Sequence, residues 1–392
     1  MNDLTRRSRD VVVSLRLTVV LLSLGMVLIF WATLSQVELG IWSVQKRFFH
    51  TFLVLERIPG TRIWAPFPGG YAIGGVLLLN LISAHIYRFK LTGKKLGIQL
   101  THTGLIVLLV GELLSGLWQE SYTMRIREGQ TVNYAEHERD YELALIDTTD
   151  ANFEEVVAVP ESLLVAGRTV QNPKLPFRVV PKLSYANATL APRADQAATP
   201  ASPATAGVGP RVLVTPRPLT YKENERNVPA IFVEFLGTAG SLGTWLISPD
   251  LDDAKSPQTF TLDGHTWKIV MRPARLYKPF SIALQEVRHD VYPGTDIPKN
   301  FSSRIHLTTP DGRDDRDVLI YMNNPMRHGG FTFYQYQMDV GHRTTVLQAV
   351  RNPSWVMPYV ACTLMTLGLC VQFLIHLWGF IKKRRAAAPA AA

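Results

Sequence analysis

Four long apolar runs stand out along the chain. They cover residues 17–34, 69–87, 96–118 and 355–381, and Glu112 is the only charged residue in any of them. Each run is long enough to cross the roughly 30 Å hydrocarbon core of a bilayer as a helix that rises about 1.5 Å per residue. The first run exceeds the apolar core of an ordinary signal peptide and no clean A-x-A cleavage site follows it, so we interpret it as a membrane span. The pattern predicts four transmembrane helices.

Between the third and fourth runs, residues 119–354 follow a different pattern. Apolar residues alternate with period two over 141–147 and 331–337, which is typical of half-buried strands. Residues 305–312 and 318–321 resemble a hairpin that turns at Pro310-Asp311-Gly312. No helical run of comparable length interrupts them, so we predict a large β-rich domain.

Residues 186–210 differ from the rest of this domain. Thirteen of these 25 residues are Ala or Pro, and no periodic apolar face is present. Such a segment has little to bury, so we expect a disordered insertion that divides the domain into lobes at 119–185 and 211–354.

Basic residues near the ends of the spans predict the orientation, because Lys and Arg resist translocation. Residues 1–16 hold four of them, the short 88–95 loop holds four, and Lys382-Lys383-Arg384-Arg385 opens the 382–392 tail. We therefore expect these three segments to be cytoplasmic. The 35–68 loop and the 119–354 domain are then extracytoplasmic.

The net charge of +9 is a consequence of this arrangement. Residues 119–354 hold 25 Lys and Arg against 27 Asp and Glu, whereas the rest of the chain holds 16 against 5. The basic excess therefore belongs to the membrane-flanking segments, and a role in nucleic-acid binding is excluded.

The two cysteines also narrow the function. Cys362 and Cys370 both fall in the fourth span, and the large domain has none. Thiol–disulfide chemistry by the domain is excluded, and the two cysteines are interpreted as small packing residues.

Three histidines lie in or at the ends of spans, and the predicted topology places all three in the cytoplasmic half of the membrane. His85 and His376 are near enough to an interface to be ordinary hydrated residues. His102 is deeper, between Thr101 and Thr103, and an imidazole in lipid is costly unless it faces protein, water or a metal. Neutral imidazole is a usual axial ligand of haem iron, so His102 is a candidate haem ligand.

The remaining histidines show no zinc-ligand spacing, and the sequence carries no nucleophile elbow, P-loop or dinucleotide-binding fingerprint. We therefore predict no self-contained catalytic centre.

Several segments together resemble the ResB family of System II cytochrome c biogenesis proteins. Leu100-Thr-His-Thr-Gly-Leu-Ile-Val-Leu-Leu-Val-Gly111 is similar to the third span of that family. Residues 292–303, then Asn324-Pro325, then Phe333-Tyr-Gln335 resemble its external motifs in the same order. Asn352-Pro-Ser-Trp355 resembles the start of its fourth span. Glu112 and the 186–210 insertion depart from the family pattern.

The resemblance implies a subunit that takes haem b as cargo from the cytoplasmic side of the bacterial inner membrane and delivers it to apocytochrome c. The intramembrane haem-ligand histidine of the family maps onto His102, whereas His85 and His376 match no family motif and are weaker candidates. The chain has no Trp-Trp pair, so the tryptophan-rich haem-handling segment is expected on a ResC/CcsA-like membrane partner. A ResA/CcsX-like thiol oxidoreductase is a further partner that the resemblance allows.

Two other functions fit the same sequence. One is a haem-independent scaffold whose external domain holds a periplasmic partner. The other is a b-type electron-transfer cytochrome, which would need a second histidine facing His102, with His85 and His376 as the available residues.

Overall fold

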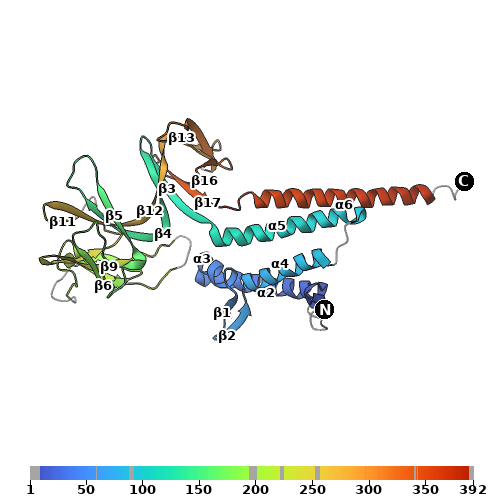
Figure 1. The fold of residues 1–392 in the computed structure, drawn as a ribbon, viewed down its shortest axis with the longest axis horizontal. Coiled ribbons are helices and arrows are strands. Elements are labelled where there is room, and N and C mark those ends of the chain that lie inside the picture. The colour runs from blue at the N-terminus through green and yellow to red at the C-terminus, as the bar shows by residue number, and fades with distance from the viewer. Residues whose placement is uncertain are drawn as a thin grey trace. The chain divides into compact units, whose positions relative to one another are not determined.

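The protein folds as two compact units in the computed structural model, which describes residues 9–58, 60–87, 92–193, 201–220, 225–251, 257–295, 297–339, 341 and 343–387. One unit runs to Gln119 and resumes at Asn352, and the other consists of the residues between them. The first unit holds the long helices and the second holds most of the strands (Figure 1).

Four helices of the first unit are long and apolar enough to cross a membrane. Their bounds are α2 Leu15–Leu39, α4 Gly70–Tyr87, α5 Leu96–Trp118 and α6 Met357–Ala387. Each overlaps one of the four predicted apolar runs, so the prediction of four helices that are long and apolar enough to span a membrane is confirmed. Their orientation in a membrane stays a prediction.

Polar contacts fix the start of α2 against α4. The Ser14 hydroxyl caps α2 by accepting a 3.2 Å hydrogen bond from the Leu17 amide. One turn later, the Thr18 hydroxyl donates a 2.7 Å bond to Oδ1 of the buried Asn80 on α4. In an apolar helix pair such a bond holds the two helices in one register.

The segment between α2 and α4 is folded, although the sequence analysis described it only as a loop. It contains the short helix α3 Ile41–Val44, the π-helix Gln45–Phe49 and an antiparallel hairpin of β1 Leu53–Arg57 with β2 Trp64–Pro68. The described part of the 88–95 loop ends in a 3-10 turn at Gly93–Lys95.

The second unit is built on one curved ten-stranded sheet with the order β14-β13-β12-β4-β3-β17-β16-β15, to which β5 and β11 add beside β4 and β12. A three-stranded sheet β10-β9-β6 and a pair β7-β8 complete the unit. The strands are β3 Glu120–Arg127, β4 Thr131–Asp147, β5 Glu155–Pro160, β6 Arg178–Tyr185, β7 Ala188–Pro192, β8 Val212–Pro216, β9 Ala230–Gly237, β10 Gly240–Ile247, β11 Gln258–Leu262, β12 His265–Val291, β13 Pro298–Thr308, β14 Asp315–Tyr321, β15 Met326–His328, β16 Phe331–Asp339 and β17 Thr344–Arg351.

The predicted strands at 141–147 and 331–337 are confirmed as parts of β4 and β16. The predicted hairpin is confirmed as β13 and β14, with Ile305 opposite Val318. Gly312 in its turn has φ +65°, a backbone conformation that glycine adopts without strain.

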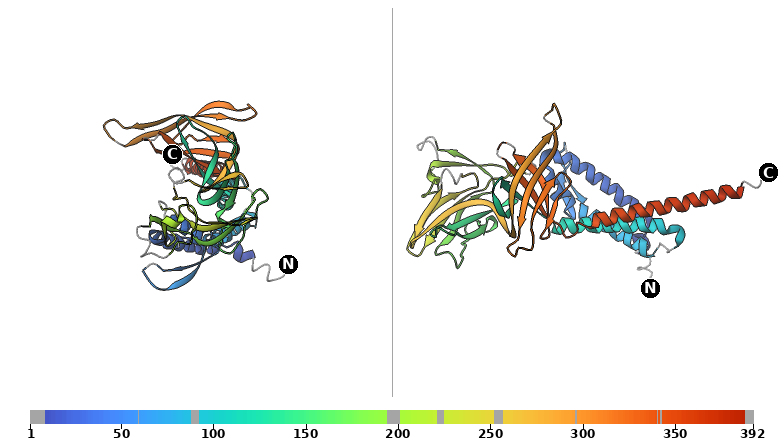
Figure 2. Two further views of the ribbon diagram at one scale, coloured as in Figure 1. Left: turned by 90° about the vertical axis from the view of Figure 1, so that its left-hand side faces the viewer. Right: turned by 90° about the horizontal axis from the view of Figure 1, so that it is seen from above.

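Two apolar cores stabilise this unit, and they do not correspond to the predicted lobes. One core joins β4, β5 and the first half of β12 to the three-stranded sheet, and the other lies inside the curve formed by β3, β13, β16 and β17. The long strands β4 and β12 contribute to both cores (Figure 2). The division into 119–185 and 211–354 was therefore wrong, because strands from both parts of the sequence pair with each other.

The expectation that 186–210 is disordered was also wrong for its described residues. β7 pairs with β8, and Ala188 and Ala204 are buried in a small core with Phe232 and Leu246. Alanine-rich sequence forms no periodic stripe, but its small side chains fit where backbones approach closely. Residues 194–200 of the predicted insertion lie outside the described part of the chain.

Candidate functional site

Helices α5 and α6 pack through a row of glycines. Gly97, Gly104 and Gly111 on α5 are spaced seven residues apart and are all buried. A Cβ at Gly104 would lie 2.7 Å from Met365 and 2.8 Å from the carbonyl oxygen of Ala361. This glycine row lets the two antiparallel backbones approach closely and fixes which face of α5 contacts α6 (Figure 1).

The glycine row directs His102 toward the other side of α5. Each residue turns a helix by about 100°, so His102 lies about 160° around the helix from Gly104. Its neighbour Thr101 faces the glycine row, where its hydroxyl donates a 3.0 Å bond to the Gly97 carbonyl. His102 is half-buried, on the side of α5 that contacts α4.

The structure brings His85 to the same place. Its Nε2 lies 3.5 Å from the hydroxyl of Thr103, the residue after His102, so His85 on α4 lies next to the His102 position on α5. Of the two threonines that flank His102, Thr101 therefore bonds to the helix backbone and Thr103 contacts His85. Two histidines from facing helices thus meet in one part of the bundle.

His376 does not join this pair. It is exposed on α6, and its Nε2 lies 3.1 Å from the amide nitrogen of Gln372, one turn earlier on the same helix. Gln372 packs against Gly97, so His376 lies at the same end of the bundle as expected. Its contact, however, is with its own helix.

The start of α6 is tied to α5 by a polar network. The side-chain amide of Asn352 donates a 3.0 Å bond to the Ser115 hydroxyl, and its oxygen caps the backbone amide of Ser354 at 2.9 Å. The Ser354 hydroxyl is buried and lies 2.8 Å from that of Ser115. This network gives a structural reason for the Asn-Pro-Ser-Trp segment that the family resemblance singled out.

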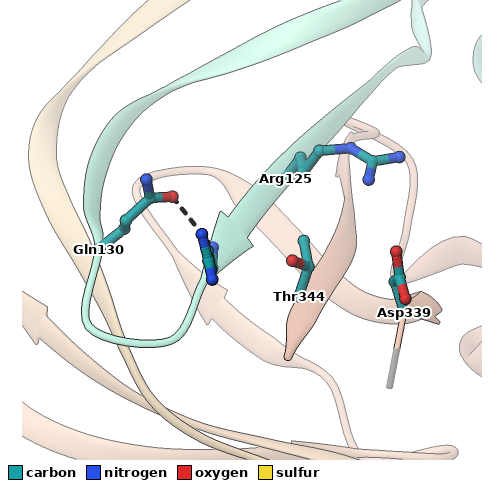
Figure 3. A pocket seen from close by; sticks show the side chains of 5 residues that line it. Arg125, Gln130, Asp339 and Thr344 are labelled. Atoms are coloured by element: carbon teal, nitrogen blue, oxygen red, sulfur yellow. Dashed lines mark hydrogen bonds between the residues drawn. The ribbon is translucent and has the colours of Figure 1, made fainter. Parts of the chain in front are cut away.

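A pocket of about 370 Å³ opens in the β-rich unit. It is lined by Arg125 and Arg127 of β3, Gln130, Asp339 and Thr344. Figure 3 shows Arg125 on β3, next to Thr344 of β17, with Asp339 beyond it. Two guanidinium groups two residues apart on one strand face can bind carboxylates or phosphates, and Asp339 offsets part of their charge.

One lysine of the same unit is buried among aromatic rings. Lys278 of β12 is 7% exposed, and its Nζ lies 3.1 Å from the ring centroid of Phe331 and 5.2 Å from that of Tyr122. Its Nζ donates no hydrogen bond to any of the described residues. Burial, helped by the Arg351 charge, lowers the pKa of Lys278 to about 8.

Four histidines of the β-rich unit, His137, His265, His306 and His328, lie in ion pairs. His306 of β13 contacts Asp317 through Nδ1 and Asp315 through Nε2, each at 2.8 Å. The hydrogen bond to Asp317 is the largest cause that raises the pKa of His306. Within the described ranges, no group of three or more His, Cys, Asp or Glu side chains could hold a metal ion.

The sequence analysis left the first of these features open, since it named both His85 and His376 as residues that could face His102, and it missed two others. The pairing of His85 with His102 follows from the α4–α5 packing, which no local motif encodes. The arginines of the pocket stand in Met124-Arg-Ile-Arg127, where period-two alternation places both charges on one strand face. Lys278 gives no sequence signal, since its burial depends on two other strands.

Comparison with known proteins finds a family that part of this chain resembles. Residues 255–346, which include β12 to β16, match the ResB-like family. Protein NrfI of Wolinella succinogenes is 27% identical over 125 residues, which are 32% of this chain and 14% of NrfI. The chain therefore matches only about a seventh of the length of that relative. The motifs at 292–303, 324–325 and 333–335 lie inside this match, so over that part of the chain the comparison supports the predicted resemblance to the ResB family.

Proposed function

We propose, from the premise that the chain is a ResB-family protein, that it is a membrane subunit of a cytochrome c biogenesis complex that moves haem across the membrane and delivers it to apocytochrome c. The observation that carries the haem part of the proposal is the meeting of His85 and His102 on facing apolar helices. The β-rich unit then lies outside the bacterial inner membrane, and the partner is a ResC/CcsA-like protein. A ResA/CcsX-like oxidoreductase would keep the apocytochrome thiols reduced.

The donor set of this site fits haem iron. Neutral imidazole is the usual axial ligand of b-type haem, and the surrounding helices are apolar enough to accept a porphyrin. Both rings stand on helices with bonded backbones, so a ligand between them leaves no backbone group unpaired. We assign His102 as the axial ligand and treat haem as cargo, not as a resident cofactor.

His85 offers a second axial position from within the chain. The alternative is that the partner subunit supplies this ligand. Since Thr103 holds the His85 ring beside His102, loss of His85 separates the two possibilities. If His85 is the second ligand, its removal lowers bound haem; if the partner supplies that ligand, the loss is small.

The experiment copurifies the full chain with a ResC/CcsA-like partner and compares three variants, His102→Ala, His85→Ala and His376→Ala. We expect His102→Ala to lower haem per complex and c-type cytochrome yield by at least several-fold. His376→Ala is the matched control, because that histidine is exposed and contacts only Gln372 by hydrogen bond among the described residues. Added imidazole should restore part of the function of His102→Ala, since it can occupy a vacated axial position but cannot repair packing.

Normal haem content and normal maturation in His102→Ala would reject the ligand assignment and leave the haem-independent scaffold as the better function. The paired histidines also favour one second candidate, a b-type electron-transfer cytochrome. That protein would hold haem when purified without a partner and would cycle reversibly between oxidation states. A cargo site predicts haem only in the complex.

A further inference from the structure

The hairpin of β1 and β2 is apolar on both of its faces. The inner face places Val54 and Phe67 in the core with Trp31 and Phe48. On the outer face, Leu53, Leu55 and Trp64 are 55%, 56% and 57% exposed. Phe52 and Ile63, next to the strands, are also exposed. Exposed apolar side chains of this density on one small element mark an interaction surface.

The hairpin is fixed to the helices at both its turn end and its base. Trp31 of α2 donates a 3.2 Å bond from its indole nitrogen to the carbonyl oxygen of Arg57, and α4 begins two residues after Pro68. A Cβ at Gly70 would lie 2.8 Å from Cα of Phe49, so the π-helix that ends at Phe49 packs directly on the first turn of α4. The hairpin is therefore held rigidly against the bundle.

The hairpin lies near one end of the spans and points away from them. Trp31 is 16 residues after Leu15, about 24 Å along α2, in the outer part of a hydrocarbon core of about 30 Å. Figures 1 and 2 show the strands extending across the α2 axis, to the side of the α2–α4 pair. A hairpin so placed runs parallel to the membrane plane, at its boundary.

The charge of this segment fits a lipid headgroup layer. Four basic residues, Lys46, Arg47, Arg57 and Arg62, stand against the single acid Glu56 between residues 45 and 68. The Arg57 guanidinium lies 5.4 Å from the ring centroid of Trp64, on the exposed face. Aromatic and basic side chains side by side are typical of protein surfaces at membrane interfaces, and the net positive charge favours anionic lipids.

The edges of the hairpin favour lipid, not an added protein strand, as the molecule that contacts it. A two-stranded sheet has unpaired backbone groups on both edges, so the hairpin cannot lie deep in the hydrocarbon core and must stay at its boundary with the headgroups. β2 carries Pro66 and Pro68, which have no N–H group. A protein strand that added to this edge would lack two donors, whereas lipid needs none.

We propose that the β1–β2 hairpin is an interfacial membrane anchor for anionic phospholipid. Leu53, Leu55 and Trp64 lie among the upper acyl chains, and Arg57 and Arg62 bind headgroup phosphates. The anchor holds the α2–α4 pair at a fixed depth and angle in the bilayer. This role is independent of haem, so it can succeed or fail separately from the proposed function.

The experiment places the full chain in nanodiscs of phosphatidylcholine with and without phosphatidylglycerol. Cys362 and Cys370 are replaced by Ala, and single cysteines at Leu55 and at the control Thr259, an exposed residue of β11, carry an environment-sensitive fluorophore. We expect lipids brominated near the headgroup to quench the Leu55 probe and not the Thr259 probe. Phosphatidylglycerol should increase the quenching, and Arg57→Gln with Arg62→Gln should remove that increase.

Two outcomes would overturn the proposal. Quenching of the Leu55 probe by aqueous iodide, as at Thr259, would place the hairpin in water. Protection from both iodide and brominated lipid would show that a second copy of the chain or another protein covers this face. An equal response with and without phosphatidylglycerol would reject the anionic-lipid part.

Discussion

The Ser303 hydroxyl donates a 2.7 Å hydrogen bond to Oε1 of Gln335, although the strands that carry these residues are not neighbours in the sheet. β13 lies near one end of the ten-stranded order and β16 near the other. The fully buried Thr345 of β17 bonds to both side chains, at 2.8 and 3.0 Å. This triad joins the two ends of the curved sheet, and it unites two of the motifs that carried the family resemblance.

We expect loss of this triad to destabilise the β-rich unit. Ser303→Ala removes a hydrogen-bond partner from the buried Thr345 and from the half-buried Gln335, which costs about 1–3 kcal/mol of unfolding free energy. Denaturant unfolding of the full chain in detergent, followed by β-sheet circular dichroism, measures this loss. Thr259→Ala on the exposed face of β11 is the control and should stay within about 0.5 kcal/mol of wild type. Equal stability of Ser303→Ala and wild type would show that the triad does not hold the sheet closed.

The glycine row predicts a large difference between two Gly→Ala changes. At Gly104 an added methyl meets Met365 and the Ala361 carbonyl, so Gly104→Ala should push α5 and α6 apart at a cost of about 1–3 kcal/mol. At Gly75 on α4 nothing lies within 4 Å of the added methyl, and alanine favours the helix by up to about 1 kcal/mol. Thermal stability of the full chain in detergent should therefore fall for Gly104→Ala and hold or rise for Gly75→Ala. A harmless Gly104→Ala would mean that the helices pack more loosely than the structure shows.

The spans and several strands were predictable because their signals are local. An uncharged run of about 20 residues has few alternatives to a membrane helix, and period-two alternation identified β4 and β16 before any pairing was known. The 35–68 segment also carried such a signal, since Leu53-Val-Leu-Glu-Arg57 pairs with Trp64-Ala-Pro-Phe-Pro68 around Gly60. This hairpin was not predicted because prolines are uncommon in strands and because the segment lies between two spans, where a simple loop was expected.

The remaining features of the fold and of the site depend on tertiary contacts between residues that are far apart in the sequence. The packing of α4 on α5 brings His85 next to His102. His376, which was expected at the same level on α6, contacts Gln372 of its own helix instead. The composition of residues 186–210 suggested disorder because the buried residues of this segment are alanines, whose small side chains give almost no apolar periodicity. Neighbouring strands decide the burial of such residues.

The distribution of Lys and Arg predicts the topology, and fusions test it. An alkaline phosphatase fusion at Gly240 in the β9–β10 turn should be active, and a fusion after Arg385 at the end of α6 should be silent, since only an exported phosphatase folds. The reverse pattern would place the β-rich unit in the cytoplasm. His85 and His102 would then face the outer half of the membrane, and the proposed direction of haem movement would be wrong.

Lys278 predicts a specific dependence of stability on pH. Its pKa is about 8 in the folded chain and 10.5 when unperturbed, so between these values the unfolded chain binds a proton that the folded chain does not. The free energy of unfolding should therefore rise with pH across this window, because deprotonation removes a buried charge from the folded state. Below pH 8 the ammonium is retained against Phe331, whose ring replaces only part of the lost hydration.

Lys278→Met keeps the volume without the charge, so it should abolish the rise between pH 8 and 10.5 and stabilise the chain at pH 7 by about 1–3 kcal/mol. Denaturant unfolding in detergent at pH 7, 8.5 and 10 measures both effects, with Lys299→Met, at an exposed lysine of β13, as the control that should keep the wild-type slope. A Lys278→Met variant with the wild-type pH slope would show that the ammonium reaches water in solution.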